Sequence, residues 1–316
     1  MHEKGNVLFP ITKEGHIKKL FPEATFVNKK APKRVIRQDY KEILGGKLTK
    51  KEFSLLPSSF DVVGDILILE VKEGLKRYEK EIAKALLATH KNLATVVKKS
   101  GIHEGEFRTQ KVTVLAGKRK KDALYVENKA RMHVNVQEMY FSPRLSSERL
   151  RIAQLVKPGE EVLVMFSGCA PYPLVIAKNS AAKEIVGIEL NPKAHEYGLK
   201  NLELNKTKNI TLIKGDVKKE TPQLGRKFDR ILMPLPKGAE DFLDTAIDAA
   251  KEGGIIHLYA FLPKEDIPQR ALEMVERACA KAGRKHKMLG VTTCGQFSPT
   301  MHRICVDFSV GRRTAA

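Results

Sequence analysis

The segment that decides the fold is residues 161–192, EVLVMFSGCAPYPLVIAKNSAAKEIVGIELNP. It holds two short apolar runs, EVLVMF and EIVGIEL, separated by APYPLVIAKNS, which suits a helix. Continuous apolar runs bounded by turn residues are typical of strands that are buried on both faces. A strand, a helix and a second strand in this order predict a βαβ unit with parallel strands.

The same alternation continues to the end of the chain. Strands are expected over 211–216, 228–236, 254–262 and 302–310, and helices over 191–205, 238–254 and 269–283. This rhythm predicts an α/β fold for residues 151–316, in which helices cover both faces of an open, mostly parallel, Rossmann-like sheet.

The amino-terminal half has a different pattern. A strand pair is expected over 60–71, an amphipathic helix over 76–99, and further strands over 107–117 and 122–141. These elements predict a middle α+β domain over residues 53–150, preceded by a short basic segment over residues 1–52. The chain is therefore expected to have a smaller α+β region before the Rossmann-like domain.

Charge is the most informative feature of the composition. Lys and Arg total 57 against 37 acidic residues, a net charge of +20, and residues 1–150 account for +13 of it. Such a field attracts polyanions, although charge alone does not separate tRNA, rRNA, DNA and acidic membranes, and a solubility role also fits. Four basic residues cluster in one stretch, either as a solvated linker or as a grip on phosphate: Lys29, Lys30, Lys33 and Arg34.

Other features bound the cellular setting. The four cysteines are scattered without a CxxC pair, no apolar run is long enough for a membrane helix, and the amino terminus does not resemble a secretory signal. We therefore expect a reduced cytoplasmic protein that is monomeric, has no metal and does not bind a membrane.

A cofactor site is expected at the carboxyl ends of the strands. Gly168 follows the first strand without a GxGxxG motif, and Glu189 ends the second, where it could accept hydrogen bonds from ribose hydroxyls. Asp216 follows the third strand and could reach an adenine amine, while Pro234 and Pro236 follow the fourth. Together and in this order, the residues at the four strand ends favour S-adenosyl-L-methionine as the cofactor. Another nucleotide is the alternative.

Several motifs carry a resemblance to a known family. FDVVGD stands at 60–65, GEFR at 105–108, YFSPRLSSER at 140–149 and NP at 191–192. From about residue 53 onward the chain resembles the archaeal and eukaryotic tRNA (guanine-37-N1)-methyltransferases, including their wyosine-pathway relatives. The resemblance implies a Rossmann-like class I methyltransferase domain, S-adenosyl-L-methionine as methyl donor and the tRNA anticodon loop as partner. The family's amino-terminal domain is shortened in this chain.

The resemblance also implies residue roles. Methylation at guanine N1 requires that nitrogen to lose its proton, which calls for a general base and for a cation near O6. By motif match Glu148 is the base and Arg108 the cation, and Arg144 is expected to bind tRNA phosphate or to orient Glu148. Further residues are expected at the cofactor: Tyr140, Arg149 and Phe166.

Three positions depart from the family pattern. Val164 and Ala170 replace an Asp and a Gly of the first catalytic-domain motif, and Pro234 replaces the Asn expected to contact the target base. Because proline has no side-chain amide, the identity of the base stays open. The leading hypothesis is methylation of guanosine 37 at N1. The alternatives are C7 methylation of 4-demethylwyosine, alone or as a second activity, aminocarboxypropyl transfer in the wyosine pathway, and a non-catalytic tRNA-binding protein.

Overall fold

The computed structural model describes residues 2–3, 6–7, 11, 14–27, 39–104, 107–235 and 237–314. At the amino end two short strands, β1 (His2–Glu3) and β2 (Asn6–Val7), pair antiparallel and are followed by helix α1 (Glu14–Leu20). No helix within the described ranges is both long and apolar enough to cross a membrane.

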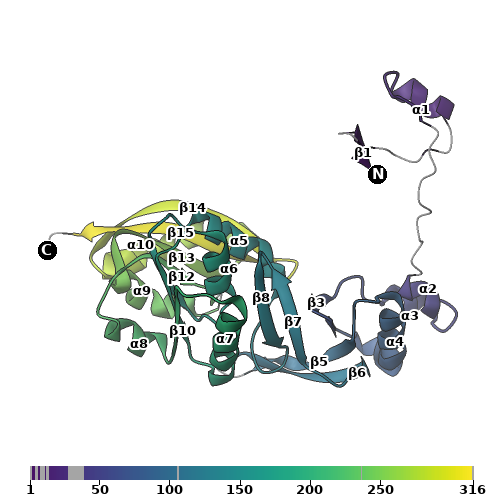
Figure 1. The fold of residues 1–316 in the computed structure, drawn as a ribbon, viewed down its shortest axis with the longest axis horizontal. Helices are drawn as coiled ribbons and strands as arrows, with labels where there is room; N and C mark the ends of the chain where they lie inside the picture. The colour runs from purple at the N-terminus through teal and green to yellow at the C-terminus, as the bar shows by residue number, and fades with distance from the viewer. Residues whose placement is uncertain are drawn as a thin grey trace.

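The next unit is a small four-stranded sheet with helices on one side (Figure 1). Its strand order is β3-β4-β5-β6, and only β4 and β5 are parallel. The elements, in chain order, are α2 (Tyr40–Leu44), α3 (Lys50–Ser54), β3 (Asp61–Val63), β4 (Ile66–Leu69), the 3-10 helix η1 (Glu73–Tyr78), α4 (Glu79–Thr89), β5 (Thr95–Glu104) and β6 (Thr109–Gly117).

The helix expected over 76–99 is therefore wrong in its second half. Helix α4 ends at Thr89, and Thr95–Glu104 forms β5 between β4 and β6. Thr95, Val96 and Val97 are fully buried in this central strand. Their β-branched side chains suit a pleated, buried surface, so sheet pairing overrides the apolar spacing that suggested a longer helix.

A hairpin connects this unit to the large domain. Strands β7 (Asp122–Glu127) and β8 (Ala130–Asn135) pair antiparallel, and the 3-10 helix η2 (Pro143–Leu145) leads into α5 (Ser146–Leu155). The edge of β8 is covered by helix α7 (Pro192–Asn205), whose Asn201 amide bonds the His133 N–H at 2.7 Å and its carbonyl at 3.1 Å. Asn205 does the same for Arg131. The two amides thus satisfy backbone groups that a neighbouring strand would otherwise bond.

The large domain is a seven-stranded sheet with helices on both faces (Figure 1), as predicted. Its strand order is β11-β10-β9-β12-β13-β15-β14, and the first five of these strands are parallel. The strands are β9 (Glu161–Met165), β10 (Glu184–Glu189), β11 (Ile210–Lys214), β12 (Phe228–Met233), β13 (Ala250–Pro263), β14 (Arg284–Gln296) and β15 (Met301–Arg313). The helices are α6 (Pro171–Asn179), α7, α8 (Val217–Gln223), α9 (Leu243–Ala249), α10 (Gln269–Lys281) and the 3-10 helices η3 (Ala239–Phe242) and η4 (Lys264–Asp266).

Two details of this domain differ from expectation. Strand β14 was not predicted, because it lies at the sheet edge with mostly exposed, polar residues and has no clear apolar alternation. The helix expected over 238–254 ends at Ala249, and strand β13 begins at Ala250. The domain boundaries expected after residues 52 and 150 remain predictions.

The motif FDVVGD explains how the small sheet joins the hairpin. Gly64 makes the β3–β4 turn with φ +59°, and a Cβ at this position would lie 2.4 Å from the Leu124 carbonyl oxygen of β7. A glycine is therefore required both for the backbone conformation and for the close approach of the two sheets. Asp65 beside it accepts an ion pair from Lys120 at 2.5 Å.

We predict that Gly64→Ala lowers the free energy of unfolding by well over the roughly 1 kcal/mol that a positive φ alone costs. Gly159→Ala is the matched control, because Gly159 has φ +81° but nothing within 4 Å of the added Cβ. Thermal melts of the two variants measure the difference. Equal losses of stability would show that the contact with Leu124 is not tight.

Candidate functional site

The loop after β9 turns sharply at the edge where the parallel strands end. Phe166, Gly168 and Ala170 all have left-handed backbone, with φ of 59°, 57° and 69°. Such residues other than glycine are uncommon and mark a constrained turn. A Cβ at Gly168 would meet only Pro171 Cδ, at 3.9 Å, so the backbone there is open to an approaching ligand.

Glu189 at the end of β10 is bound to this loop. Its carboxylate accepts hydrogen bonds from the backbone N–H of Gly168 at 2.6 Å and of Asn191 at 2.7 Å. Burial raises the pKa of Glu189, and these backbone hydrogen bonds oppose the rise. Since a carboxylate has about four acceptor positions, Glu189 keeps capacity for the hydroxyls of a ribose. The open backbone at Gly168, beside this carboxylate, therefore fits a nucleoside.

The other predicted cofactor residues share this edge to different degrees. Phe166 packs edge-on against Phe242, with ring centroids 4.8 Å apart. Asp216 is the N-cap of α8 and accepts from the Lys218 N–H at 2.9 Å. Pro234 follows β12 directly, whereas Pro236 lies outside the described residues.

Arg108 is carried to the same edge from the other unit. It lies in the β5–β6 turn with φ 49°, and that hairpin extends toward the large domain (Figure 1). Its guanidinium donates to the Lys237 carbonyl at 2.5 Å, just past the end of β12. Burial lowers the pKa of Arg108, while the nearby Tyr140 hydroxyl acts in the opposite direction. Tyr140 in turn accepts from Arg303 of β15 at 3.0 Å.

Glu148 lies in the first turn of α5 and is buried, with 6% of its surface exposed. Its carboxylate accepts two hydrogen bonds from Arg151 and one from the Tyr259 hydroxyl, each 2.7 Å long. The thiol of Cys294 lies beside this carboxylate. Burial raises the pKa of Cys294, and the negative charge of Glu148 adds to the rise. The position of the carboxylate is therefore fixed by Arg151 on its own helix and by two strands of the large sheet, β13 and β14.

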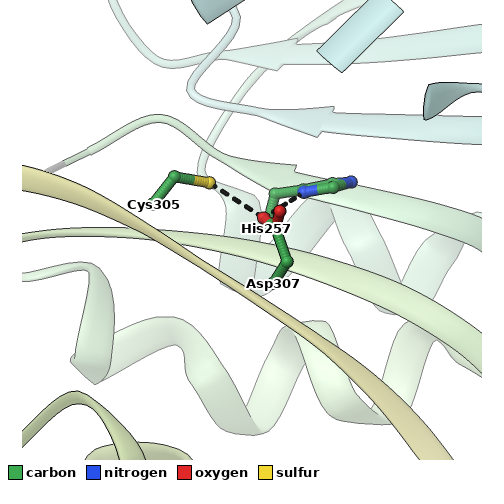
Figure 2. Close-up of side chains that lie close together, drawn as sticks. All are labelled: His257, Cys305 and Asp307. Carbon is green, nitrogen blue, oxygen red and sulfur yellow. Dashed lines mark hydrogen bonds and ion pairs between the residues drawn. The ribbon is translucent and has the colours of Figure 1, made fainter. Parts of the chain in front are cut away.

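A chain of buried polar groups continues from Arg151. Arg151 donates to Asp307 at 2.8 Å, and Asp307 lies 2.7 Å from His257 Nδ1, directly opposite it in the β13–β15 register (Figure 2). His257 Nε2 lies 2.7 Å from Arg230, so we assign the ring proton to Nδ1. Burial lowers the pKa of His257, although Asp307 opposes the shift.

The ligand atoms of His257, Cys305 and Asp307 lie within 4.8 Å of one another, a spacing that also suits a metal (Figure 2). Each of them is already engaged: His257 with Arg230, Cys305 with Asp307 at 3.1 Å, and Asp307 with Arg151. Two guanidinium groups beside the cluster would repel a cation. We therefore interpret the cluster as part of the ion-pair network. Sequence reasoning missed this network because its members are distant in the chain and carry no shared motif.

Two further predicted residues, Arg149 and Arg144, are engaged in ion pairs. Arg149 is 2% exposed and forms a two-point ion pair with Glu127, its Nη2 lying 2.7 Å from Oε2. Arg144 pairs with Asp61 at 2.6 Å and is largely exposed. Four predicted phosphate contacts lie outside the described residues: Lys29, Lys30, Lys33 and Arg34.

Comparison with known proteins agrees with this geometry. The model of the TRM5/TYW2 methyltransferase domain matches residues 123–289, and that of the TYW2 N-terminal domain matches residues 40–120. The chain belongs to the TRM5/TYW2 methyltransferase family.

Individual relatives cover most of the chain. It is 37% identical to the tRNA (guanine(37)-N(1))-methyltransferase Trm5b of Pyrococcus abyssi, over 86% of this chain and 80% of the relative. The crystal structure of that Trm5b superimposes with a TM-score of 0.80 at 36% identity, covering 90% of this chain and 84% of that one. The complex of aTrm5 with tRNALeu gives a TM-score of 0.77 at 30% identity, over 95% and 87% of the chains. Taw22 of Nanoarchaeum equitans, named a tRNA (guanine(37)-N(1))/4-demethylwyosine(37)-methyltransferase, is 32% identical over 72% of this chain and 92% of its own.

The buried histidine gives a pH-dependent prediction. Burial lowers the pKa of His257 in the folded chain, whereas in the unfolded chain the residue has the ordinary histidine pKa of about 6.5. Below about pH 6.5 the unfolded chain therefore binds a proton at His257 that the folded chain does not bind. The free energy of unfolding should therefore fall with decreasing pH below about 6.5, by at most about 1.4 kcal/mol per pH unit from this residue. Urea unfolding at pH 7.5, 6.5 and 5.5 measures the slope. His257→Gln, which keeps a donor and an acceptor, should flatten it, and an unchanged slope would contradict a neutral buried His257.

Proposed function

We propose that this protein transfers a methyl group from S-adenosyl-L-methionine to N1 of guanosine 37 in the tRNA anticodon loop. The observation that carries the proposal is the convergence of Arg108 and the cofactor-type loop at one edge, with Glu148 held beneath the adjoining strands. The names of relatives that match most of the chain support the same reaction. We place the activity in the cytoplasm and expect a monomer.

The loop at Gly168 and the carboxylate of Glu189 would hold the nucleoside part of the donor. Glu189 would accept from the ribose hydroxyls, and the open backbone at Gly168 would let the donor lie close to the sheet. When bound, the donor supplies an electrophilic methyl group on a sulfonium that needs no further activation. The enzyme's task is then to align the accepting nitrogen and to remove its proton.

Glu148 would act as the general base. Arg151 and Tyr259 occupy three of the roughly four acceptor positions of its carboxylate, and the thiol of Cys294 lies beside it. A thiol is a weak donor, so an N–H of the substrate base can displace it. Arg108, tethered at Lys237, would stabilise the negative charge that develops on O6 as N1 loses its proton.

The RNA side of the proposal rests on charge and on the anticodon loop itself. A base within a structured loop has to be turned out into the site, at a cost of a few kcal/mol. Phosphate contacts from the basic first 150 residues would offset this cost, and Lys29, Lys30, Lys33 and Arg34 stay candidates for them. Arg144, with its exposed side chain beside Asp61, is a further candidate.

A second candidate function is C7 methylation of 4-demethylwyosine at the same position of tRNA. Pro234 favours it, because that residue follows β12 at the site edge and offers no amide to a guanine. The similarity to Taw22, whose name includes both activities, supports the possibility of two acceptors in one site.

The deciding experiment is product analysis. The protein is incubated with S-adenosyl-L-methionine and with either an unmodified tRNA transcript or tRNA bearing 4-demethylwyosine, and the nucleosides are identified by mass spectrometry. We expect 1-methylguanosine from the first. A C7-methylated base formed only from the second would replace the leading proposal with the alternative, and an aminocarboxypropyl adduct or the absence of any product would overturn both.

Single-turnover rates test the residue roles. Glu148→Gln should slow methyl transfer by about 10²–10⁴-fold and Arg108→Ala by about 10²–10³-fold, with donor binding retained. Glu196→Gln and Arg270→Ala are matched controls, because both residues are surface ion-pair partners on helices outside the site. Wild-type rates in both site variants, measured on folded protein, would remove Glu148 and Arg108 from the mechanism.

A further inference from the structure

Phe297 is the most exposed of the large apolar side chains among the described residues. It is 68% exposed, in the turn between β14 and β15. Its backbone is nevertheless held firmly, because Phe297 N–H and Ser298 N–H both donate to the Met301 carbonyl, at 2.8 and 3.1 Å. The ring is thus presented to solvent from a closed turn.

The ring of Phe297 is supported from below. It lies 4.6 Å from the ring of Phe261, measured between centroids, at an interplanar angle of 41°. The guanidinium of Arg303 lies 5.2 Å from the centre of the Phe261 ring, and its Nε is buried without a hydrogen-bond partner. Two aromatic rings and a cation therefore form one continuous surface.

This surface adjoins the catalytic groups along the same face of the sheet. The pairs His257–Asp307, Tyr259–Cys305 and Phe261–Arg303 follow one another in the β13–β15 register, two residues apart, so they share a face. Tyr259 bonds Glu148 and Arg303 bonds Tyr140. Because two strand residues span about 7 Å, the aromatic pair lies one step beyond the Glu148 carboxylate toward the strand ends.

We propose that Phe297, supported by Phe261 and Arg303, is a stacking platform for a nucleobase of the RNA that flanks the methylated one. The inference rests on the proposed function, in that the substrate is a single-stranded RNA loop. Bases turned out of such loops are bound by stacking on aromatic rings and on arginine planes. The platform meets this need because it offers both, and because it is continuous with the site of Glu148 and Arg108 through Tyr259 and Tyr140.

The test measures RNA binding separately from methyl transfer. Binding of a fluorescein-labelled unmodified tRNA transcript is followed by anisotropy, and donor binding by calorimetry. Phe297→Ala and Phe297→Leu should weaken RNA binding by about 5- to 150-fold, the equivalent of losing one stacked base, while Phe297→Trp stays close to wild type. Donor affinity should not change in any of them. Leu289→Ala is the matched control, since Leu289 is 49% exposed farther along β14 and should bind RNA as the wild type does.

A second readout locates the base. Transcripts carrying 2-aminopurine at the nucleotide on either side of position 37 should show a fluorescence change on binding to the wild type, at one of the two positions, that is lost in Phe297→Ala. Wild-type RNA affinity in Phe297→Ala, or full recovery by Phe297→Leu, would overturn the stacking role. Sedimentation showing that Phe297→Ala dissociates a dimer would do the same, by assigning the ring to an interface between two copies. If the wild type binds the transcript through Phe297 but forms no methylated product, only the proposed function fails.

Discussion

The side chain of Arg151 is the interaction on which the rest of the site depends. It extends from α5 and bonds Glu148 on its own helix and Asp307 on β15, so one guanidinium joins the Glu148 carboxylate to the large sheet. Glu148 and Asp307 are both buried, and a buried carboxylate without a cation costs several kcal/mol. Burial alone would raise the pKa of Asp307, but the bonds from His257 and Arg151 outweigh it and hold the pKa well below its usual value. These hydrogen bonds and ion pairs thus fix the position of α5 relative to the strands of the large sheet.

Two tight contacts complete the arrangement. Gly64 lets the small sheet approach β7, and the left-handed Arg108 turn reaches the carbonyl of Lys237 from that sheet. The cofactor-type loop contributes its own constraint, because Glu189 binds the backbone at Gly168. Residues from three separate regions of the chain therefore meet at one edge, and the exposed Phe297 extends that edge outward.

The sequence predicted the parts of the molecule in which local pattern and tertiary structure agree. Buried runs such as EVLVMF and EIVGIEL can pair only inside a covered sheet, so the strands and their order of appearance followed from them. The pattern did not predict β5, where the apolar spacing continues that of the preceding helix, or the edge strand β14, which has no clear apolar alternation. At the site, motif match selected Arg108 and Glu148, whose catalytic roles stay a prediction. It could not reveal Arg151, His257 and Asp307 as partners, since only the β13–β15 register and the docking of α5 bring them together. It also could not show that Arg149 is used in a buried pair with Glu127.

The most direct test of this account is a double-mutant cycle between Arg151→Met and Asp307→Asn, measured as the free energy of unfolding in urea. If Arg151 anchors α5 to β15 as described, the sum of the losses in the two single variants should exceed the loss measured in the double variant. The difference, the coupling energy, should be about 1–3 kcal/mol. Effects that add within about 0.5 kcal/mol would contradict it, because the two residues would then be acting independently.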